Sequence, residues 1–255
     1  MRNSIKSLGA LILLSGSIFA TTKSYNFENP KQIIKITAGK SIDAPGQNIM
    51  KSCYFYDKYV IIEVNDPAIM GATSLKIYPI TTKVNYNAFC KTSTNNPNGY
   101  NIRVESGGLS GYYSGKYEGF ILTNGPDSFG ASYPFQIFSI SKQVYQLVLT
   151  DNQVDKEPFK FIKTKNGETG INYWRVVSSD CSLLLGNGDV CWQKILRDNK
   201  ITQKLLRPKC TKEYKRVKAP ADSPTQVLLH VEIPDLSKPL GRHTVSEKTK
   251  CYPSP

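Results

Sequence analysis

The sequence contains 255 residues, 40% of them apolar and 11% aromatic, which excludes a disordered chain and suits one large β domain or two small ones. Its 33 basic residues outnumber its 20 acidic residues, for a formal net charge of +13. This excess favours anionic partners such as phospholipid or lipopolysaccharide surfaces, acidic glycans or nucleic acid, although some exported proteins are basic only because charge keeps them soluble.

The N-terminus has the layout of a secretory signal peptide. Arg2 and Lys6 supply a short positive region, and residues 8–20 are apolar or small and end in Ala20. This run is shorter than the roughly 20 residues of a membrane-spanning helix. We predict that residues 1–20 are removed and that the protein is soluble and either periplasmic or secreted; a buried N-terminal helix is the alternative. The remaining 31 basic and 20 acidic residues would carry a charge of +11.

Six cysteines remain after this cleavage, and an even number of cysteines in an exported chain predicts disulfides. Many connectivities are open to six cysteines, so we assign the pairs by their proximity in the sequence. The favoured pairs are Cys53–Cys90, which flanks the first of two similar segments, Cys181–Cys191, which closes a short loop, and Cys210–Cys251, which ties down the tail.

The first part of the exported chain predicts short strands joined by turns. Residues 33–37 form a strand candidate, and residues 43–46 contain the Pro-Gly pair of a turn. Residues 53–56 and 59–64 are rich in aromatic and β-branched residues and are separated by two polar residues, which indicates a β-hairpin.

Two segments, residues 59–84 and 117–144, then share one pattern. Each contains N-x-P-x-x-x-G-A-[T/S], at residues 65–73 and 124–132, with an apolar run before it and an alternating run after it. The proline cannot donate to a strand ladder and the glycine can take a positive φ, so a strand must end within the motif. We interpret the pattern as a duplicated strand–loop–strand unit.

Three further stretches fit the same β pattern. Residues 95–99 read as a loop, and the glycine–tyrosine stretch at 107–117 reads as sharp turns between short β segments. Residues 159–177, with Asn166-Gly167 as a turn, resemble a shortened third unit.

The sequence changes character at Cys181. Residues 191–198 place Trp192, Ile195 and Leu196 on one face of a predicted short helix. Residues 227–233 predict a strand, and the last twenty residues predict a polar loop held through Cys251.

These features predict a mainly β, antiparallel fold that is propeller-like or sandwich-like, is built on the duplicated strand–loop–strand unit, and carries one short C-terminal helix. Repeated units bury their apolar faces against one another, but two or three units are too few to close a propeller. The predicted organisation is a signal peptide at 1–20, a repeat-containing β domain at 21–180, and a disulfide-rich extension at 181–255 packed on that domain.

Recognisable catalytic chemistry is sparse in this sequence. No G-x-S-x-G elbow, Walker-type loop, Rossmann fingerprint or C-x-x-C occurs, and the only histidines are His230 and His243. We expect no metal site, no cofactor and no catalytic set. Asp66 and Asp127 are candidate acids for a hydrolase of polymers, but they do not occupy equivalent positions in the two segments.

Candidate binding residues fall into two groups. The motif loops and the glycine–tyrosine stretch offer polar and aromatic side chains at Asn65, Asp66, Asn124, Asp127, Tyr112, Tyr113 and Tyr117. Turn geometry explains the repeated asparagines and glycines better than a ligand does. A second group, the basic patch, comprises Arg207, Lys209, Lys212, Lys215, Arg216 and Lys218, and is either a solvated face or a docking site for a polyanion. We expect no specific nucleic-acid recognition.

The chain resembles a group of exported bacterial proteins with no assigned activity. The resemblance rests on the signal peptide and on five short stretches: residues 53–59, Asn65-Asp66-Pro67, Gly71-Ala72, Cys191-Trp192 and Pro208-Lys209-Cys210. It covers most of the chain after the signal peptide. It implies an exported bacterial protein and supplies no catalytic or binding residue.

The function that fits these features is a non-enzymatic binding module for an anionic component of the cell envelope or for a protein partner. Two alternatives remain open. One is a hydrolase of cell-envelope or extracellular polymers, and the other is a structural subunit of a larger envelope complex.

Overall fold

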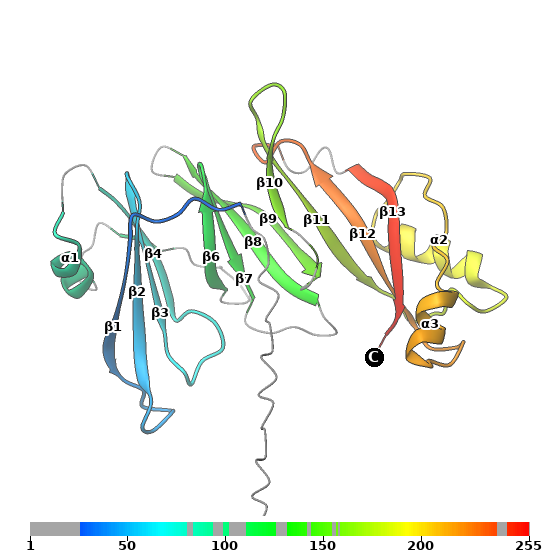
Figure 1. Ribbon diagram of the computed structural model, residues 1–255, viewed down its shortest axis with the longest axis horizontal. Helices are drawn as coiled ribbons and strands as arrows, with labels where there is room; N and C mark the ends of the chain where they lie inside the picture. The colour runs from blue at the N-terminus through cyan, green and yellow to red at the C-terminus, as the bar shows by residue number, and fades with distance from the viewer. Residues whose placement is uncertain are drawn as a thin grey trace, which may run out of the picture.

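The computed structural model describes residues 26–80, 84–93, 99–101, 111–125, 132–141, 144–154, 157, 159–238 and 244–254. Within these residues the protein is mainly β, with two antiparallel sheets and three helices. Figure 1 shows the smaller sheet at one end of the long axis and two of the helices at the other end.

The first sheet is a five-stranded antiparallel meander in sequence order. Its strands are β1 (Gln32–Lys40), β2 (Asn48–Phe55), β3 (Tyr59–Asn65), β4 (Ser74–Pro79) and β5 (Tyr100–Asn101). The predicted strand at 33–37 and the predicted hairpin at 53–64 are confirmed as β1 and as the β2–β3 pair.

Helix α1 (Tyr86–Thr92) covers one face of this sheet. Asn85 caps the helix by accepting a hydrogen bond from the Ala88 amide at 3.1 Å. The ring of Phe55, which is fully buried, lies 4.4 Å from the Tyr86 ring and 6.2 Å from the Phe89 ring. The first sheet and α1 therefore share a core of their own.

The second sheet has eight strands. Its strands are β6 (Tyr112–Tyr117), β7 (Phe120–Asn124), β8 (Ser132–Ser141), β9 (Val144–Val154), β11 (Thr169–Ser178), β12 (Thr225–Ile233) and β13 (Thr244–Pro253), with β10 (Lys160–Lys163) paired to β11 beside this series. All described pairings are antiparallel. The strands after residue 181 belong to the same sheet as the strands before it, and the proposed division at residue 180 stays a prediction.

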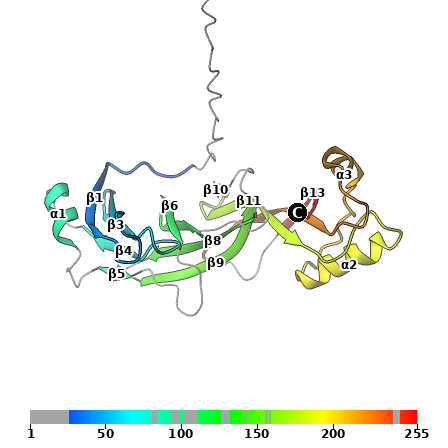
Figure 2. The same ribbon diagram turned by 90° about the horizontal axis from the view of Figure 1, so that it is seen from below.

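The segment between β11 and β12, residues 179–224, forms what we call the C-terminal helical layer. It contains α2 (Gly188–Asp198) and α3 (Thr211–Val217). Trp192, Ile195 and Leu196 of α2 are buried in the same core as the strand residues of β11 and β12, as the predicted helical face requires. Figure 2 shows α2 and α3 at the end of the molecule opposite α1.

The two sheets meet through a third core. Ile61 and Ile77 of the first sheet are buried together with Ile121 and Ile140 of the second sheet. Glu63 of β3 adds a polar link, because its carboxylate accepts a hydrogen bond from the Tyr113 amide of β6 at 2.9 Å.

All three predicted disulfides are present. Cys53–Cys90 joins β2 to α1, Cys181–Cys191 joins the end of β11 to α2, and Cys210–Cys251 joins the start of α3 to β13. No cysteine is left free. Three disulfides indicate an oxidising compartment. The predicted signal peptide at residues 1–20 lies outside the described residues.

Both similar segments contain an antiparallel strand–loop–strand element, β3–β4 and β7–β8, but their registers differ. Val64 faces Ser74 across the first pair. The equivalent residue of the second pair, Thr123, faces Gln136, which is three residues beyond the position that an identical register would give. Duplication of a whole unit is therefore not established, and the two sheets establish neither a propeller nor a sandwich.

Two predictions about the C-terminal part are wrong. Among the described residues after Cys181 there are two helices, α2 and α3, whereas one was predicted, and the predicted polar loop at the end of the chain contains β13. Helix α3 buries only Tyr214, so it has no apolar periodicity to detect. Strand β13 carries mostly polar residues because it lies at the edge of the sheet.

Candidate functional site

The basic segment around α3 is the most distinctive charged surface in the described residues. We call it the α3 basic surface. It consists of Arg207, Lys209, Lys212, Lys215, Arg216 and Lys218, all exposed. Because these side chains come from one short helix and its two flanks, they present their charge from one place on the molecule.

Few of these charges are neutralised within the protein. Arg207 lies 3.3 Å from Asp189 of α2, and Arg216 lies 2.7 Å from Glu213 one turn earlier in α3. In the part of the chain that the structure describes, no carboxylate pairs with the four lysines of the surface. Exposed lysines without acidic partners leave a positive potential that an anionic ligand can use.

The α3 basic surface stands on a well-fixed base. Tyr214 is buried, and its hydroxyl lies 2.7 Å from the Thr225 hydroxyl and donates to the Ser223 carbonyl at 2.9 Å. The Cys210–Cys251 disulfide fixes the start of the helix to β13. Lys218 ends the helix with a left-handed backbone conformation, φ 55°. The backbone that carries the charges is therefore constrained at both ends.

The first motif loop is built as a turn. Asp66 accepts hydrogen bonds from the Ser41 hydroxyl at 2.6 Å and from the Ala68 amide at 3.0 Å. Asn65, the residue before it, is half-buried at the end of β3. These contacts are those of an Asx turn, and they tie the β3–β4 loop to the β1–β2 loop.

Only the two ends of the second motif loop lie within the described residues. Asp127 lies outside the described residues, so its proposed pairing with Asp66 has no structural counterpart. Asn124 accepts a hydrogen bond from the Gln153 side chain at 2.9 Å, which links β7 to β9. Asn124 thus acts within the sheet.

The three tyrosines of β6 do not form one platform. The Tyr113 ring packs against the Tyr54 ring at 4.6 Å and faces the first sheet. The Tyr117 ring stacks on the Phe161 ring at 4.9 Å on the other face of the second sheet. Tyr112 is exposed. A bulge between Tyr113 and Gly115 produces this split between faces.

A cleft of about 310 Å³ lies where the two sheets meet. Lys116 is buried at its floor, 2.6 Å from the Glu28 carboxylate, and its ammonium lies 5.3 Å from the centre of the Tyr56 ring. Glu118, on the rim, pairs with Lys163 at 2.6 Å. The central charges of the cleft are paired with one another, so these contacts hold the N-terminal segment and the β6–β7 turn together.

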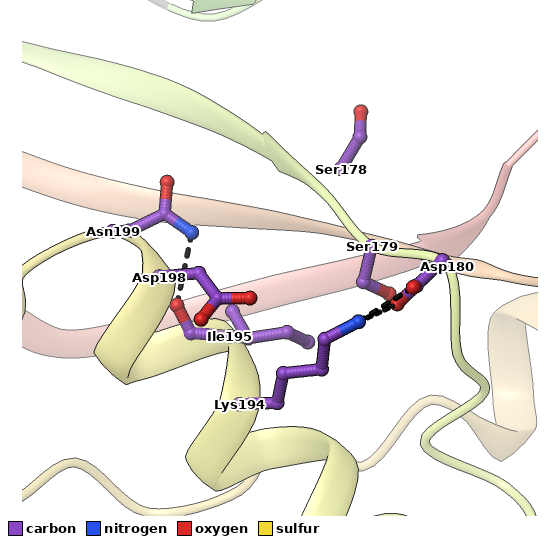
Figure 3. A pocket seen from close by; sticks show the side chains of 7 residues that line it. All are labelled: Ser178, Ser179, Asp180, Lys194, Ile195, Asp198 and Asn199. Carbon is purple, nitrogen blue, oxygen red and sulfur yellow. Dashed lines mark hydrogen bonds and ion pairs between the residues drawn. The ribbon is translucent and has the colours of Figure 1, made fainter.

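A second pocket, of about 230 Å³, lies between the end of β11 and α2. Figure 3 shows the Lys194 ammonium reaching the Asp180 carboxylate across this pocket, whereas Ser178 points away. The hydrogen bond from Lys194 lowers the pKa of Asp180. The pocket is open and polar, and its best-defined contact joins two of its own residues.

The histidine that the structure describes does not form a nucleophile pair. The His230 ring packs against the Trp174 ring at 5.2 Å, and its Nδ1 atom is buried with no hydrogen-bond partner in the described residues. Burial, and then the charge of Lys248, lower the pKa of His230. His243 lies outside the described residues.

Sequence reasoning missed a buried lysine, Lys51 of β2. Its ammonium has no hydrogen-bond partner in the described residues, and burial followed by the charge of Lys76 lowers its pKa. The side chain is 1% exposed, so a substrate cannot reach it without a conformational change. No sequence signal distinguishes it from the other strand lysines.

Sequence reasoning also missed a second surface, which we call the apolar tip. It consists of four large hydrophobic side chains on two neighbouring hairpins of the first sheet: Ile42 (90% exposed), Met50 (38%), Ile69 (46%) and Met70 (70%). The run Pro67-Ala68-Ile69-Met70 was a usable signal, because four consecutive apolar residues are unusual in a turn.

The described ranges contain neither a cluster of metal-binding side chains nor a helix that could cross a membrane. No group of three or more His, Cys, Asp or Glu side chains within them is arranged to hold a metal ion. None of their helices has the length and apolar character needed to cross a membrane.

Comparisons with protein-family models, with curated proteins and with solved structures find no match to this chain.

Proposed function

We propose that the protein is an exported, non-enzymatic binding module that holds an anionic component of the cell envelope on its α3 basic surface. The observation that supports this most directly is the set of four exposed lysines, Lys209, Lys212, Lys215 and Lys218, that lack a carboxylate partner in the described residues. The net charge of +11 that remains without residues 1–20 acts in the same direction at longer range.

The anchoring of the surface supports binding over simple solvation. A charged segment that only improved solubility would need no fixed backbone. Here the Cys210–Cys251 disulfide and the buried Tyr214 fix the helix that carries the charges. A fixed backbone lowers the entropy that is lost when a ligand orders the site.

Export rests on the sequence and on the disulfides. The N-terminal 20 residues have the order of a signal peptide, and all six cysteines are paired as an oxidising compartment requires. An export assay that compares the full chain with a variant in which Leu13 and Leu14 are changed to Asp would test the signal directly.

The binding test uses a panel of anionic phospholipid vesicles, lipopolysaccharide and acidic glycans at low and high salt. The triple variant K212Q/K215Q/R216Q should bind its best partner roughly a hundredfold more weakly, because each basic residue near an anionic surface contributes about 1 kcal/mol. Added salt should weaken wild-type binding through screening.

A matched control changes three exposed lysines elsewhere, K91Q/K160Q/K165Q. This control removes the same total charge and leaves the α3 basic surface intact. Equal losses in both triple variants would mean that only net charge matters, and would rule out a localised site. No binding to any member of the panel would refute the proposal.

The hydrolase alternative has no observation in its favour among the described residues. Asp66 is engaged by Ser41 and Ala68 in a turn, and Asp127 lies outside the described ranges. We therefore advance no second function.

A further inference from the structure

We propose that the apolar tip inserts into the interface of an anionic phospholipid bilayer. This inference deepens the proposed function by naming the anionic component, and it rests on a different part of the molecule. The tip residues Ile42 and Met70 are the two most exposed large hydrophobic side chains of the first sheet.

The shape of the tip argues for a lipid surface. Ile42 stands on the β1–β2 loop, Ile69 and Met70 stand on the β3–β4 loop, and Met50 lies in the adjoining β2. The two loops lie next to each other at one end of the sheet in Figure 1. Exposed apolar patches that are not covered within the molecule mark protein or membrane contact sites.

The Ser41–Asp66 hydrogen bond sets the two loops side by side. Asp66 receives the Ser41 hydroxyl from the β1–β2 loop at 2.6 Å and the Ala68 amide from its own loop at 3.0 Å. The carboxylate is therefore occupied at the base of the tip. One polar residue thus positions the apolar side chains of both loops.

The loop backbones carry internal hydrogen bonds, which matters because lipid offers no partners to peptide groups. In the β1–β2 loop the Ala44 amide donates to the Ser41 hydroxyl at 3.1 Å, and the Gln47 amide donates to the Ala44 carbonyl at 3.1 Å. In the β3–β4 loop the Ile69 amide donates to the Asp66 carbonyl at 3.0 Å. These bonds reduce the cost of moving the loops into an apolar environment.

The charge of the molecule favours an anionic bilayer over a neutral one. The net charge of +11 that remains without residues 1–20 attracts the whole protein to a negative surface, and Lys40, exposed directly before the β1–β2 loop, adds a positive charge beside the tip. Asp43 opposes this attraction, because it is the exposed acid of the same loop.

The first experiment measures flotation with vesicles of phosphatidylglycerol and phosphatidylethanolamine in about 1 M salt, where the Debye length is roughly 3 Å and attraction between exposed charges is screened. The variant I42S/M70S should lower the bound fraction about tenfold or more, because two large apolar side chains no longer leave water. The matched control L147S, at a strand residue 47% exposed on β9, should bind as the wild type does.

A second readout reports the position of the tip. In M70W, the added tryptophan should shift its emission to shorter wavelength on the anionic vesicles and should be quenched by brominated lipids. In L147W, neither change should occur. Every variant is prepared as the exported chain that begins after residue 20, so differences between variants report the tip.

The role of Asp66 is tested by two variants that remove the same charge. D66N keeps an oxygen that accepts from Ser41 and Ala68, so it should bind at least as well as the wild type. D66A loses that acceptor and frees the loops, so it should bind more weakly than D66N. D43N should bind anionic vesicles more tightly. Equal binding by D66N and D66A would show that Asp66 does not position the loops of the apolar tip.

Three outcomes would overturn the insertion itself. They are unchanged binding by I42S/M70S, an M70W spectrum that does not respond to any vesicle, and a response that depends only on protein concentration, which would assign the tip to a second copy of the chain. Failure of the α3 proposal looks different. In that case K212Q/K215Q/R216Q would keep the low-salt binding of the wild type, whatever the tip variants do.

Discussion

The first sheet and the C-terminal helical layer reach a fixed structure by different means. The first sheet is a meander of neighbouring strands with two apolar faces, held by its ladder and its cores. The helical layer has two helices and long irregular connections, held by side chains that bond to the backbone. Trp192, for example, donates to the Leu205 carbonyl at 3.0 Å.

Both regions expose apolar side chains, among them Ile42 of the first sheet and Leu206 of the helical layer, but only the helical layer carries the α3 basic surface. Loops between well-paired strands can carry exposed apolar residues, because the sheet does not need them for its core. The helical layer also buries apolar side chains, such as Trp192, Ile195 and Leu196, but its irregular connections are held in addition by disulfides and by buried hydrogen bonds. Each region therefore presents the residues that its own stability does not require.

The largest expected effect comes from removing one disulfide from each region. Cys53–Cys90 and Cys210–Cys251 span 37 and 41 residues, so each should contribute about 4 kcal/mol through loop closure. The doubles C53S/C90S and C210S/C251S should lower the free energy of urea unfolding by similar amounts. Only the second should also weaken binding to anionic ligands, because only the second releases α3 from β13.

These two double variants test whether only the C-terminal helical layer supports anionic binding. If C53S/C90S weakened anionic binding as much as C210S/C251S, at a temperature where both variants remain folded, the α3 basic surface would not be the site. Amide hydrogen exchange in α1 and α3 would show which helix each bridge holds.

A smaller effect comes from one buried hydroxyl in each region. The Tyr78 hydroxyl donates to the Ser93 carbonyl at 2.7 Å in the first sheet. The Tyr214 hydroxyl contacts three oxygens, those of Ser223, Pro224 and Thr225. Y78F should cost about 1 kcal/mol and Y214F about 1–2 kcal/mol, because more buried partners are left unsatisfied.

Thermal unfolding of the two variants measures this difference. A larger cost for Y78F than for Y214F would contradict the view that the helical layer depends more on side-chain hydrogen bonds. Y214F should also lower the affinity for anionic ligands slightly, whereas Y78F should leave it unchanged.

The sequence predicted the parts of the fold that local chemistry determines. Cysteine proximity was enough to pair Cys53 with Cys90 and Cys181 with Cys191, because each pair closes a loop within one region. The face of Trp192, Ile195 and Leu196 predicted α2, which begins three residues before the predicted start at 191. A repeated turn motif predicted two hairpins and could not predict their registers, which depend on cross-strand packing.

The rest of the fold depends on contacts that leave no periodic signal. Helix α1 is short, and its clearest sequence signal is the capping residue Asn85. Helix α3 rests on the single buried residue Tyr214. Of the proposed binding residues, the basic patch lies together on one surface, whereas Tyr113 and Tyr117 face opposite ways because of a one-residue bulge.

The smallest expected effect concerns the pH dependence of the stability that two glutamates at the junction of the sheets contribute. We expect this dependence to have opposite signs for the two residues. Burial, the largest influence, raises the pKa of Glu63, although the Tyr113 amide and the Tyr54 hydroxyl donate to it. Burial also raises the pKa of Glu118, but hydrogen bonds from Lys163 and Thr169 outweigh it and lower that pKa overall. Folded Glu63 thus holds its proton more tightly than the unfolded chain does, and folded Glu118 holds its proton less tightly.

Linkage turns these directions into a test. Stability from Glu63 is present at low pH and is lost as the pH rises through its folded-state pKa, so E63Q should gain stability relative to the wild type between acidic and neutral pH. Stability from Glu118 is present at neutral pH and is lost as the pH falls through its folded-state pKa, so E118Q should be less stable at neutral pH and should approach the wild type in acid. Urea unfolding of both variants from about pH 2 to about pH 7, a range that extends below the lowered pKa of Glu118, measures the two slopes. If the stability difference from the wild type changed with pH in the same direction for both variants, the prediction would be wrong. The burial of Glu63 and the ion pair of Glu118 would then not shift the two pKa values in opposite directions.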